Sequence, residues 1–243
     1  MRLFGLIGYP LAQSFSKKYF TEKFLNEGIE DAAYELFELE NIQQFPALLN
    51  SHKNLCGINV TIPYKQDVMA YVHELDEEAK TIGAVNCIKF TGGKLKGFNT
   101  DALAFEQSLK ALLYPFHNKA LVLGTGGAAK AIIYVLKKLG IEYQYVSRTK
   151  KQGQVTYEEL TPEIMHDHLL IINCTPLGSF PKVDTAPQIP YELLTPKHYL
   201  YDLVYNPPLS LFLQKGQEQG AVVKNGYDML VNQAELGWKI WNS

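Results

Sequence analysis

The chain is poor in cysteine, has no long apolar run and carries almost no net charge, and each absence excludes a class of protein. Its three cysteines, Cys56, Cys87 and Cys174, lack C-x-x-C spacing. We interpret them as reduced thiols of a cytoplasmic protein. No apolar run reaches the roughly 18 residues that a membrane helix needs, so we expect no membrane partner. The apolar opening segment, residues 1–8, is too short to be read as a secretory signal peptide.

Charged residues and histidines form no pattern that indicates nucleic-acid or metal binding. Lysine and arginine number 23 against 25 acidic residues, a net charge of −2, which argues against a nucleic-acid partner. The six histidines form no zinc-like set, so we predict no metal site. We expect His166 and His168 to lie on a polar surface turn. With 47% apolar and 20% charged residues, the composition is that of an ordinary soluble protein.

What the chain does contain is a glycine-rich segment between a strand-like and a helix-like stretch. Residues 120–123 form a short apolar run, and after the glycines apolar residues recur at helical spacing up to Gly140. Gly124, Gly126 and Ala129 occupy the three positions of the G-x-G-x-x-A dinucleotide fingerprint. The first glycine permits a tight turn, the second lets the backbone approach a pyrophosphate, and the helix N-terminus attracts the anion. The segment predicts nucleotide binding, with an empty structural turn as the alternative.

The end of the next predicted strand indicates which nucleotide is bound. Residues 142–146 run into Ser147–Lys151, which contains three cations and no carboxylate. At this point of such folds an acidic residue binds the ribose 2′-hydroxyl of NAD, whereas an arginine accommodates the 2′-phosphate of NADP. Arg148 can meet a phosphate with a planar, bidentate guanidinium. We therefore expect NADP, and the alternative is a solvated basic loop.

Apolar periodicity and turn residues predict alternating strands and helices, and hence an α/β fold. We expect two α/β domains with a cleft between them: residues 1–100 joined by a final helix over 226–243, and a Rossmann-like domain over 101–225. Strands are predicted at 3–7, 33–38, 55–62, 85–90, 94–98, 120–123, 142–146, 169–173, 199–204 and 221–224. Helices are predicted at 16–28, 42–50, 67–72, 74–82, 100–113, 127–139, 210–219 and 226–241.

Polar side chains follow several strands of the first half at the point where each strand ends. Singly, each has an ordinary explanation: Ser16 as a helix N-cap, Lys65 as a solvated lysine, Asp101 as the cap of the linking helix. Jointly they fall where open α/β sheets place ligands, and their chemistry suits a small polyhydroxy acid. The set comprises Ser14, Ser16, Asn59, Thr61, Lys65, Asn86, Asn99, Thr100 and Asp101.

A series of short motifs runs through nearly the whole chain. In order they are Gly8-Tyr9-Pro10 with Ser14-x-Ser16, Asn59–Lys65, Gly83–Asn86, Gly97–Asp101, Gly124–Lys130, Ser147–Thr149, Asn173–Gly178, Tyr201–Pro207, and Gly226-x-x-Met229 with Gln233. In this order the motifs resemble the shikimate dehydrogenase family. The resemblance implies an N-terminal substrate domain and a Rossmann-like NADP-binding domain. It also implies a reversible, NADPH-dependent reduction of 3-dehydroshikimate to shikimate, in the route to chorismate and aromatic amino acids.

The resemblance further implies roles for particular residues. Lys65 and Asp101 would be the catalytic pair, with Lys65 protonating the oxygen that gains charge when a ketone receives a hydride. The implied substrate-binding residues are Ser14, Ser16, Thr61, Lys65, Asn86, Asp101, Tyr205 and Gln233. The implied cofactor-binding residues are Gly124, Thr125, Gly126, Gly127, Ala128, Ala129, Ser147, Arg148, Thr149, Lys151, Thr175, Leu203, Gly226 and Met229. Ser14 and Ser16 would hold the substrate carboxylate, and Met229 would lie by the nicotinamide.

The chain departs from the family pattern on the side of the predicted adenosine site. The stretch after Thr149 is shorter than usual, and we expect it to lack one helix and one strand of the nucleotide domain. Ser147 stands where the family commonly has asparagine, and Gln152 where it commonly has a second arginine.

Other functions remain open from the sequence. A quinate/shikimate dehydrogenase that uses NAD typically shows an acidic residue where this chain has Lys150. A non-catalytic shikimate-binding paralogue would be expected to lose the lysine–aspartate pair. Methylenetetrahydrofolate dehydrogenases share the two-domain plan but not the Ser-x-Ser and Asn-Thr-Asp motifs. We expect a small-molecule substrate as partner, and a monomer or a homodimer.

Overall fold

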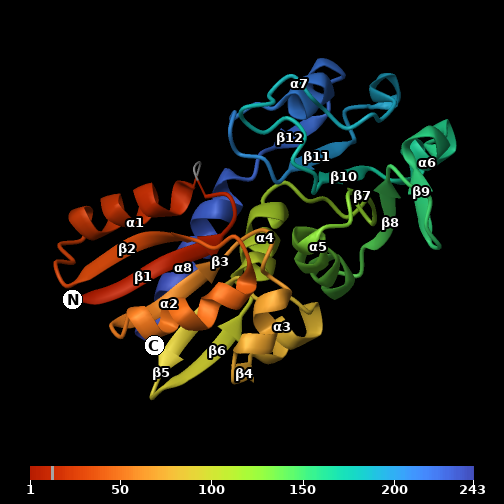
Figure 1. Ribbon diagram of the computed structural model, residues 1–243. Coiled ribbons are helices and arrows are strands. Elements are labelled where there is room, and N and C mark those ends of the chain that lie inside the picture. The colour runs from red at the N-terminus through yellow and green to blue at the C-terminus, as the bar shows by residue number, and fades with distance from the viewer. Residues whose placement is uncertain (12–13) are drawn as a thin grey trace. The chain divides into compact units, whose positions relative to one another are not determined.

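A computed structural model describes residues 1–11 and 14–243 (Figure 1). The chain divides into two compact units, Met1–Thr100 with Ala234–Ser243, and Asp101–Gln233. These units differ from the predicted domains in residues 226–233, which belong to the second unit. None of the helices that the described residues form is long and apolar enough to cross a membrane.

The first unit contains a mixed six-stranded sheet. Its strands are β1 (Arg2–Gly8), β2 (Ala32–Glu38), β3 (Leu55–Val60), β4 (Glu74–Leu75), β5 (Cys87–Thr91) and β6 (Lys94–Phe98). Their spatial order is β2-β1-β3-β5-β6-β4, in which β3–β5 and β5–β6 are antiparallel and the other pairs are parallel. Its helices are α1 (Phe15–Asn26), η1 (Ile42–Gln44), α2 (Phe45–Ser51), η2 (Asp67–Tyr71), α3 (Glu77–Ile82) and the last part of α8 (Tyr227–Asn242).

Both faces of this sheet are buried. Successive residues of a strand point to opposite faces, so neighbouring residues of β1 belong to different cores. In β1, Leu3 and Ile7 join a core with Phe45 of α2. The intervening Phe4 joins a second core with Phe20 of α1. Figure 1 shows α1 running beside β2, which agrees with the contacts between these two elements. A strand covered on both faces reads as a continuous apolar run, which is how the β1 sequence reads.

Trp241 of α8 closes the second core and leaves no room for a side chain on β3. Its ring stacks on Phe4 with centroids 5.0 Å apart, and its Nε1 donates to the Ile88 carbonyl at 3.0 Å. A Cβ added at Gly57 would lie 2.3 Å from Trp241 Nε1. Gly237, one turn earlier in α8, has only ordinary contacts, the nearest at 3.5 Å.

The second unit contains a six-stranded sheet in which every pair is parallel. Its strands are β7 (Lys119–Leu123), β8 (Glu142–Ser147), β9 (Gln154–Thr156), β10 (Leu170–Asn173), β11 (Tyr199–Asp202) and β12 (Val222–Lys224). Their order, β12-β11-β10-β7-β8-β9, is the 3-2-1-4-5-6 order of the Rossmann fold and confirms the predicted fold class. Its helical segments are α4 (Thr100–Lys110), α5 (Gly127–Lys138), η3 (Tyr157–Glu159), α6 (Pro162–Asp167), η4 (Tyr191–Leu193) and α7 (Leu211–Glu218).

The expectation that a helix and a strand are missing after Thr149 is half wrong. The strand is present as β9, which pairs parallel to β8 from Tyr145↔Gln154 to Ser147↔Thr156. Only residues 148–153 connect the two strands, and these described residues contain no helix. Parallel neighbours normally need a crossover of a dozen or more residues. Six suffice here because β9 pairs only with the last three residues of β8, so the chain has little distance to return.

Three local expectations also need correction. The N-cap of α1 is Ser14, whose Oγ accepts from the Ser16 N–H at 3.3 Å, so Ser16 lies inside the helix. Residues 74–75 form the strand β4, and α3 begins only after its cap, Asp76. Helix α4 ends at Lys110 and not at residue 113. Ala12 and Gln13, which precede α1 in the sequence, lie outside the described residues.

Gly57→Ala and Gly237→Ala are expected to change stability in opposite directions. The first forces a methyl group into the Trp241 ring and should lower the free energy of unfolding by about 1–3 kcal/mol. The second fits its site and removes a helix-interior glycine, which should raise it by about 0.5–1 kcal/mol. Urea unfolding followed by tryptophan fluorescence measures both. Equal effects of the two substitutions would contradict the packing described for Trp241.

Candidate active site

Directly before β5 lies a fully buried amide that joins two segments of the first unit. Asn86 is 2% exposed. Its Oδ1 accepts from the Thr100 N–H at 2.7 Å and its Nδ2 donates to Thr100 Oγ1 at 2.9 Å. Thr100 is the first residue of α4, so the Asn86 amide satisfies one of the backbone donors that a helix start leaves open. Burial with both amide ends bonded leaves Asn86 one orientation.

A second buried amide, Asn59 of β3, connects this point to the aromatic core. Tyr34 donates its hydroxyl to Asn59 Oδ1 at 2.8 Å, and Asn59 Nδ2 donates to the Asn86 carbonyl at 3.4 Å. The Tyr34 ring stacks on Phe20 of α1 with centroids 4.5 Å apart. Burial raises the pKa of Tyr34 well above its usual value, while a hydrogen bond with Ser16 opposes the shift. The structure thus brings Ser16, Tyr34 and Asn59 together.

Thr61 and Lys65 lie in the turn after β3. The Thr61 N–H donates to the Ile7 carbonyl of β1 at 2.9 Å, and the Lys65 carbonyl accepts from the Val85 N–H at 2.7 Å. The turn is therefore bonded to the ends of two other chain segments, and it holds the half-buried side chains of Thr61 and Lys65 at the carboxyl edge of the sheet.

The remaining predicted substrate residues belong to the second unit. Asp101 lies in the first turn of α4 and is 6% exposed, a position where the helix dipole favours a carboxylate. Gln233 is half-buried and donates its Nε2 to the Leu230 carbonyl at 2.9 Å. Tyr205 follows β11, and burial raises the pKa of its hydroxyl.

The glycine turn after β7 has two glycines that differ in what they require. Gly124 has φ +96°, and a Cβ there would lie 2.9 Å from Thr175 Cγ2, so both backbone and space exclude a side chain. Gly126 has φ −75°, and a Cβ there would meet no described atom within 4 Å. No described side chain caps α5 at Gly126, and the described first turn of α5 has no acidic residue. The open backbone at Gly126 is suited to the close approach of an anion.

Gly226 packs closely against the residues that follow β11. A Cβ there would lie 2.3 Å from the Leu203 carbonyl oxygen, and its N–H donates to the Val204 carbonyl at 3.1 Å. Met229, in the first turn of α8, is buried. The predicted cofactor residues Leu203 and Gly226 are therefore in direct contact.

The basic loop after β8 is cross-linked by its own side chains. Ser147 Oγ contacts the Thr149 carbonyl at 2.6 Å and Gln154 Oε1 at 3.0 Å. Lys150 pairs with Glu159 at 2.5 Å. Arg148 is exposed and makes no ion pair with any described residue. Of the loop's cations, Arg148 is thus available for a phosphate and Lys150 is held by a carboxylate.

A buried polar network at the ends of β10 and β11 was not found from the sequence. Asp202, with 0% exposure, accepts at Oδ1 from Asn173 Nδ2 (2.9 Å) and from the Val204 N–H (3.0 Å). Its Oδ2 accepts from the Ser210 hydroxyl. Asn173 Oδ1 accepts from the Thr175 N–H (3.0 Å) and from its hydroxyl (2.6 Å). Burial raises the pKa of Asp202 to about 6, and its hydrogen bonds oppose the shift.

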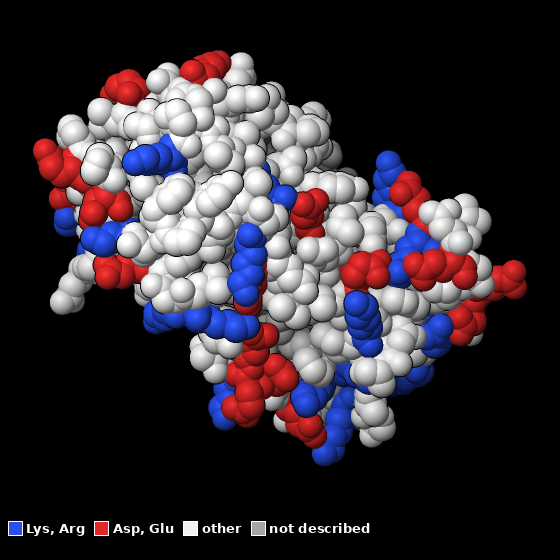
Figure 2. Space-filling model, turned by 180° about the vertical axis from the view of Figure 1, so that it is seen from behind, with Lys and Arg blue, Asp and Glu red and all other residues white. Residues whose placement is uncertain are grey.

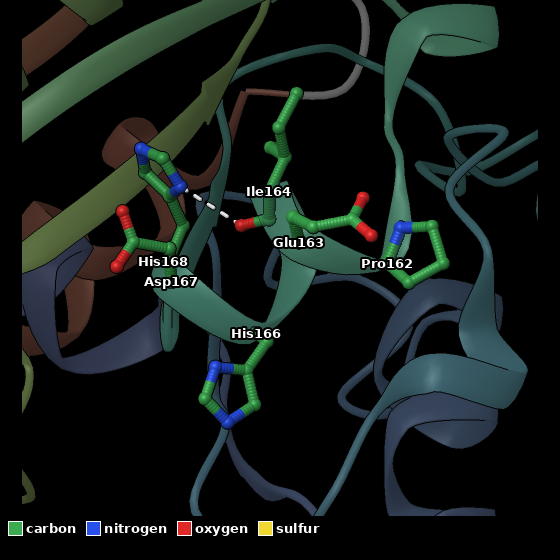
Figure 3. Close-up of a pocket in the computed structure, with 6 residues that line it drawn as sticks. All are labelled: Pro162, Glu163, Ile164, His166, Asp167 and His168. Carbon is green, nitrogen blue, oxygen red and sulfur yellow. Dashed lines mark hydrogen bonds between the residues drawn. The ribbon is translucent and has the colours of Figure 1, made fainter.

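A pocket beside α6 does not have the character of a catalytic site (Figure 3). His168 Nδ1 bonds the Ile164 carbonyl of its own helix at 2.9 Å. Asp167 pairs with Lys119 at 2.6 Å, and this bond lowers the pKa of Asp167. His166 points away from both in Figure 3. His166 thus lies within a short helix, and not on the predicted turn, with His168 as the C-cap.

Several charged side chains elsewhere form local ion pairs, such as Lys17 with Glu35 and Lys94 with Glu74. Figure 2 shows acidic and basic side chains next to one another on the visible face. Among residues 1–11 and 14–243, no group of three His, Cys, Asp or Glu side chains is arranged to hold a metal ion.

Comparison with known proteins places this geometry in a family. The family model of the shikimate dehydrogenase substrate binding domain matches residues 6–88. A shikimate dehydrogenase (NADP(+)) of Clostridium beijerinckii is 41% identical over 254 residues, which cover 99% of this chain and 92% of that protein. The chain belongs to the shikimate dehydrogenase family.

Two further relatives agree with this membership. The shikimate dehydrogenase (NADP(+)) of Desulforamulus reducens is 34% identical and covers 98% of this chain and 88% of its own length. The shikimate 5-dehydrogenase of Thermus thermophilus, solved in complex with NADP(H) and shikimate, aligns with a TM-score of 0.87 at 31% identity. That alignment covers 99% of this chain and 93% of the Thermus chain.

The raised pKa of Asp202 predicts a pH-dependent stability. The folded pKa of about 6 lies above the unfolded value. The contribution of Asp202 to the free energy of unfolding is therefore fully present below about pH 4 and is lost as the pH rises through 6. Relative to Asp202→Asn, the wild type should lose about 2–3 kcal/mol of unfolding free energy between pH 4 and pH 7.5. Urea unfolding of both proteins across this range measures the difference. Parallel stability curves would contradict the assignment.

Proposed function

We propose that the chain is a shikimate dehydrogenase that reversibly reduces 3-dehydroshikimate to shikimate with NADPH. The observation that carries this proposal is the match of nearly the whole chain to NADP-dependent shikimate dehydrogenases. The geometry supports it, because buried amides and hydroxyls lie at the strand ends of one unit and an anion-binding glycine turn lies in the other. The first unit would bind the substrate and the second NADP, in a cytoplasmic enzyme of the route to chorismate.

The second unit fits NADP at both of its phosphate positions. The uncapped N-terminus of α5, with space for a ligand at Gly126, suits the pyrophosphate. The exposed guanidinium of Arg148 suits the 2′-phosphate, and Lys151 follows three residues later in the chain. We assign the rest of the cofactor contacts to Thr175, Leu203, Gly226 and Met229.

The substrate chemistry follows from residue types at the carboxyl edge of the first sheet. When bound, the reduced nicotinamide supplies the hydride. Lys65 then stabilises the negative charge on the substrate oxygen and donates the proton that completes the alcohol. We assign Asp101 as the acidic partner that orients Lys65 for this transfer. In the reverse reaction Lys65 accepts the proton.

The other polar groups would orient the ring. Ser14 and Ser16 hold the substrate carboxylate, and Ser16 is already oriented by Tyr34. Thr61, Asn86, Tyr205 and Gln233 bind the hydroxyls. Because each hydroxyl needs a buried partner, a substrate that lacks one leaves a protein group unpaired and is disfavoured.

Initial rates of absorbance change at 340 nm, with shikimate and quinate each crossed with NADP and NAD, test the proposed function. We expect turnover of shikimate with a strong preference for NADP, because the end of β8 is followed by Arg148 and not by an acidic residue. Comparable rates with NAD or quinate would instead indicate a quinate/shikimate dehydrogenase. Binding of shikimate without turnover would indicate a non-catalytic paralogue.

Substitution of Lys65 tests its role as the proton donor. Lys65→Ala should lower kcat by about 10²–10⁴-fold with a much smaller change in KM, the usual effect of losing a general acid. Lys53→Ala is the matched control, because Lys53 is an exposed lysine of the same unit that contacts only Asn50 among the interactions described. Near-normal kcat in Lys65→Ala would refute the assignment.

A further inference from the structure

Asp202 is the one member of the buried network at the ends of β10 and β11 that can only accept hydrogen bonds. An ionised carboxylate has no donor, whereas an amide or a hydroxyl can donate or accept. Its Oδ1 faces Asn173 Nδ2 and the Val204 N–H, and its Oδ2 faces the Ser210 hydroxyl. Each group that forms a hydrogen bond with the ionised Asp202 must therefore be the donor.

This requirement sets the orientation of the Asn173 amide. With Nδ2 directed at Asp202, Asn173 Oδ1 is left to face Thr175. The only other described contact of Nδ2, with the Leu177 carbonyl at 3.5 Å, lies at the limit of a hydrogen bond. If the amide turned over, its NH₂ group would face the two donors of Thr175. The carboxylate thus determines that the oxygen is available where Thr175 needs it.

Thr175 in turn packs on the glycine turn. Both its N–H and its hydroxyl donate to Asn173 Oδ1, which fixes its backbone and its rotamer together. Its Cγ2 lies 2.9 Å from the place that a Cβ of Gly124 would occupy. Strands β7 and β10 are neighbours, and the crevice beyond their carboxyl ends is where the strand order reverses and where such sheets bind ligands.

The same carboxylate also holds the chain after β11. The Val204 N–H donates to Asp202, and the Val204 carbonyl accepts from the Gly226 N–H. The Leu203 N–H donates to the Asn173 carbonyl at 3.0 Å. Asp202 therefore links the segments that contain Thr175 and Leu203.

We propose that Asp202 is a positioning residue for the cofactor: by accepting only, it sets the direction of hydrogen bonding through Asn173, which holds Thr175 against Gly124 in the arrangement that binds NADP. This inference rests on the proposed function. Asp202 touches neither substrate nor cofactor in this role and acts through the loops after β10 and β11. A buried carboxylate is a poor source of stability, so its effect is expected on binding.

Asp202→Asn tests the proposal with little change in shape. The new amide can still bond its neighbours, but it can present either an oxygen or an NH₂ group to Asn173, so the direction of the network is no longer unique. At pH 8, where the wild-type carboxylate is ionised, the variant should be at least as stable as the wild type. Its Kd for NADPH, from ligand fluorescence, should rise about three- to tenfold, the effect of one neutral hydrogen bond.

Ser210→Ala is the matched control. Ser210 contacts the other carboxylate oxygen and caps α7, where it accepts from the Leu213 N–H. Its loss should lower the free energy of unfolding, since an N-cap is removed, but leave the Kd for NADPH within about twofold of the wild type. The two substitutions are thus expected to separate stability from cofactor binding. A merely structural role of Asp202 predicts that affinity follows stability in both.

The hydrogen-exchange rate of the Thr175 amide reports on the hydrogen-bond network in the absence of the cofactor. In Asp202→Asn it should exchange faster than in the wild type, and in Ser210→Ala at an unchanged rate. Unchanged exchange in Asp202→Asn overturns the proposal, as does an unchanged Kd in that variant or an equal rise in Kd in both. If the wild type fails to bind NADPH, the proposed function fails, and the exchange rates alone then decide whether Asp202 sets the network.

Discussion

Buried side-chain amides at strand ends must be fully hydrogen-bonded, and much of the site architecture follows from this requirement. A buried donor or acceptor without a partner costs about 1–3 kcal/mol, so each amide admits few arrangements of its neighbours. Asn86 joins the start of β5 to the start of α4, and Asn59 joins β3 to Tyr34. In the second unit Asn173 joins β10 to β11 through Asp202. In each case one polar side chain fixes two chain segments near strand ends, where α/β sheets generally place ligands.

The amides reach into the cores as well as toward the ligand edge. Tyr34 bonds Asn59 at one end and stacks on Phe20 at the other, so the position of α1 and that of Asn59 are coupled. Helix α1 also carries Ser16 and its own cap, Ser14. With Ser14 and Ser16 as the proposed substrate-binding residues, a substitution in the aromatic core would alter substrate binding without contacting the substrate, because interiors are packed too densely to absorb a shift locally.

Glycines allow the same edge to come close to a ligand or to another strand. Gly124 is required by its positive φ and by Thr175, and Gly226 by the carbonyl of Leu203. Gly126 has an ordinary φ and open space, so the fold alone does not explain it, whereas an anion at the start of α5 does. The connection from β8 to β9 is short: its described residues 148–153 contain Arg148 at the strand end but no helix.

By itself, the sequence determined the alternation of strands and helices, the glycine turn and the set of polar residues after the strands, because these depend on local periodicity and on backbone freedom. The tertiary structure decided what local patterns do not contain. Two serines two residues apart can each cap a helix; in the structure Ser14 is the cap of α1, and Ser16 hydrogen-bonds with Tyr34. The strands β4 and β9 have two and three residues, too few for a period, and exist because β6 and β8 offer them partners. Asp202 and Asn173 are 29 positions apart, and only the pairing of β10 with β11 makes them neighbours.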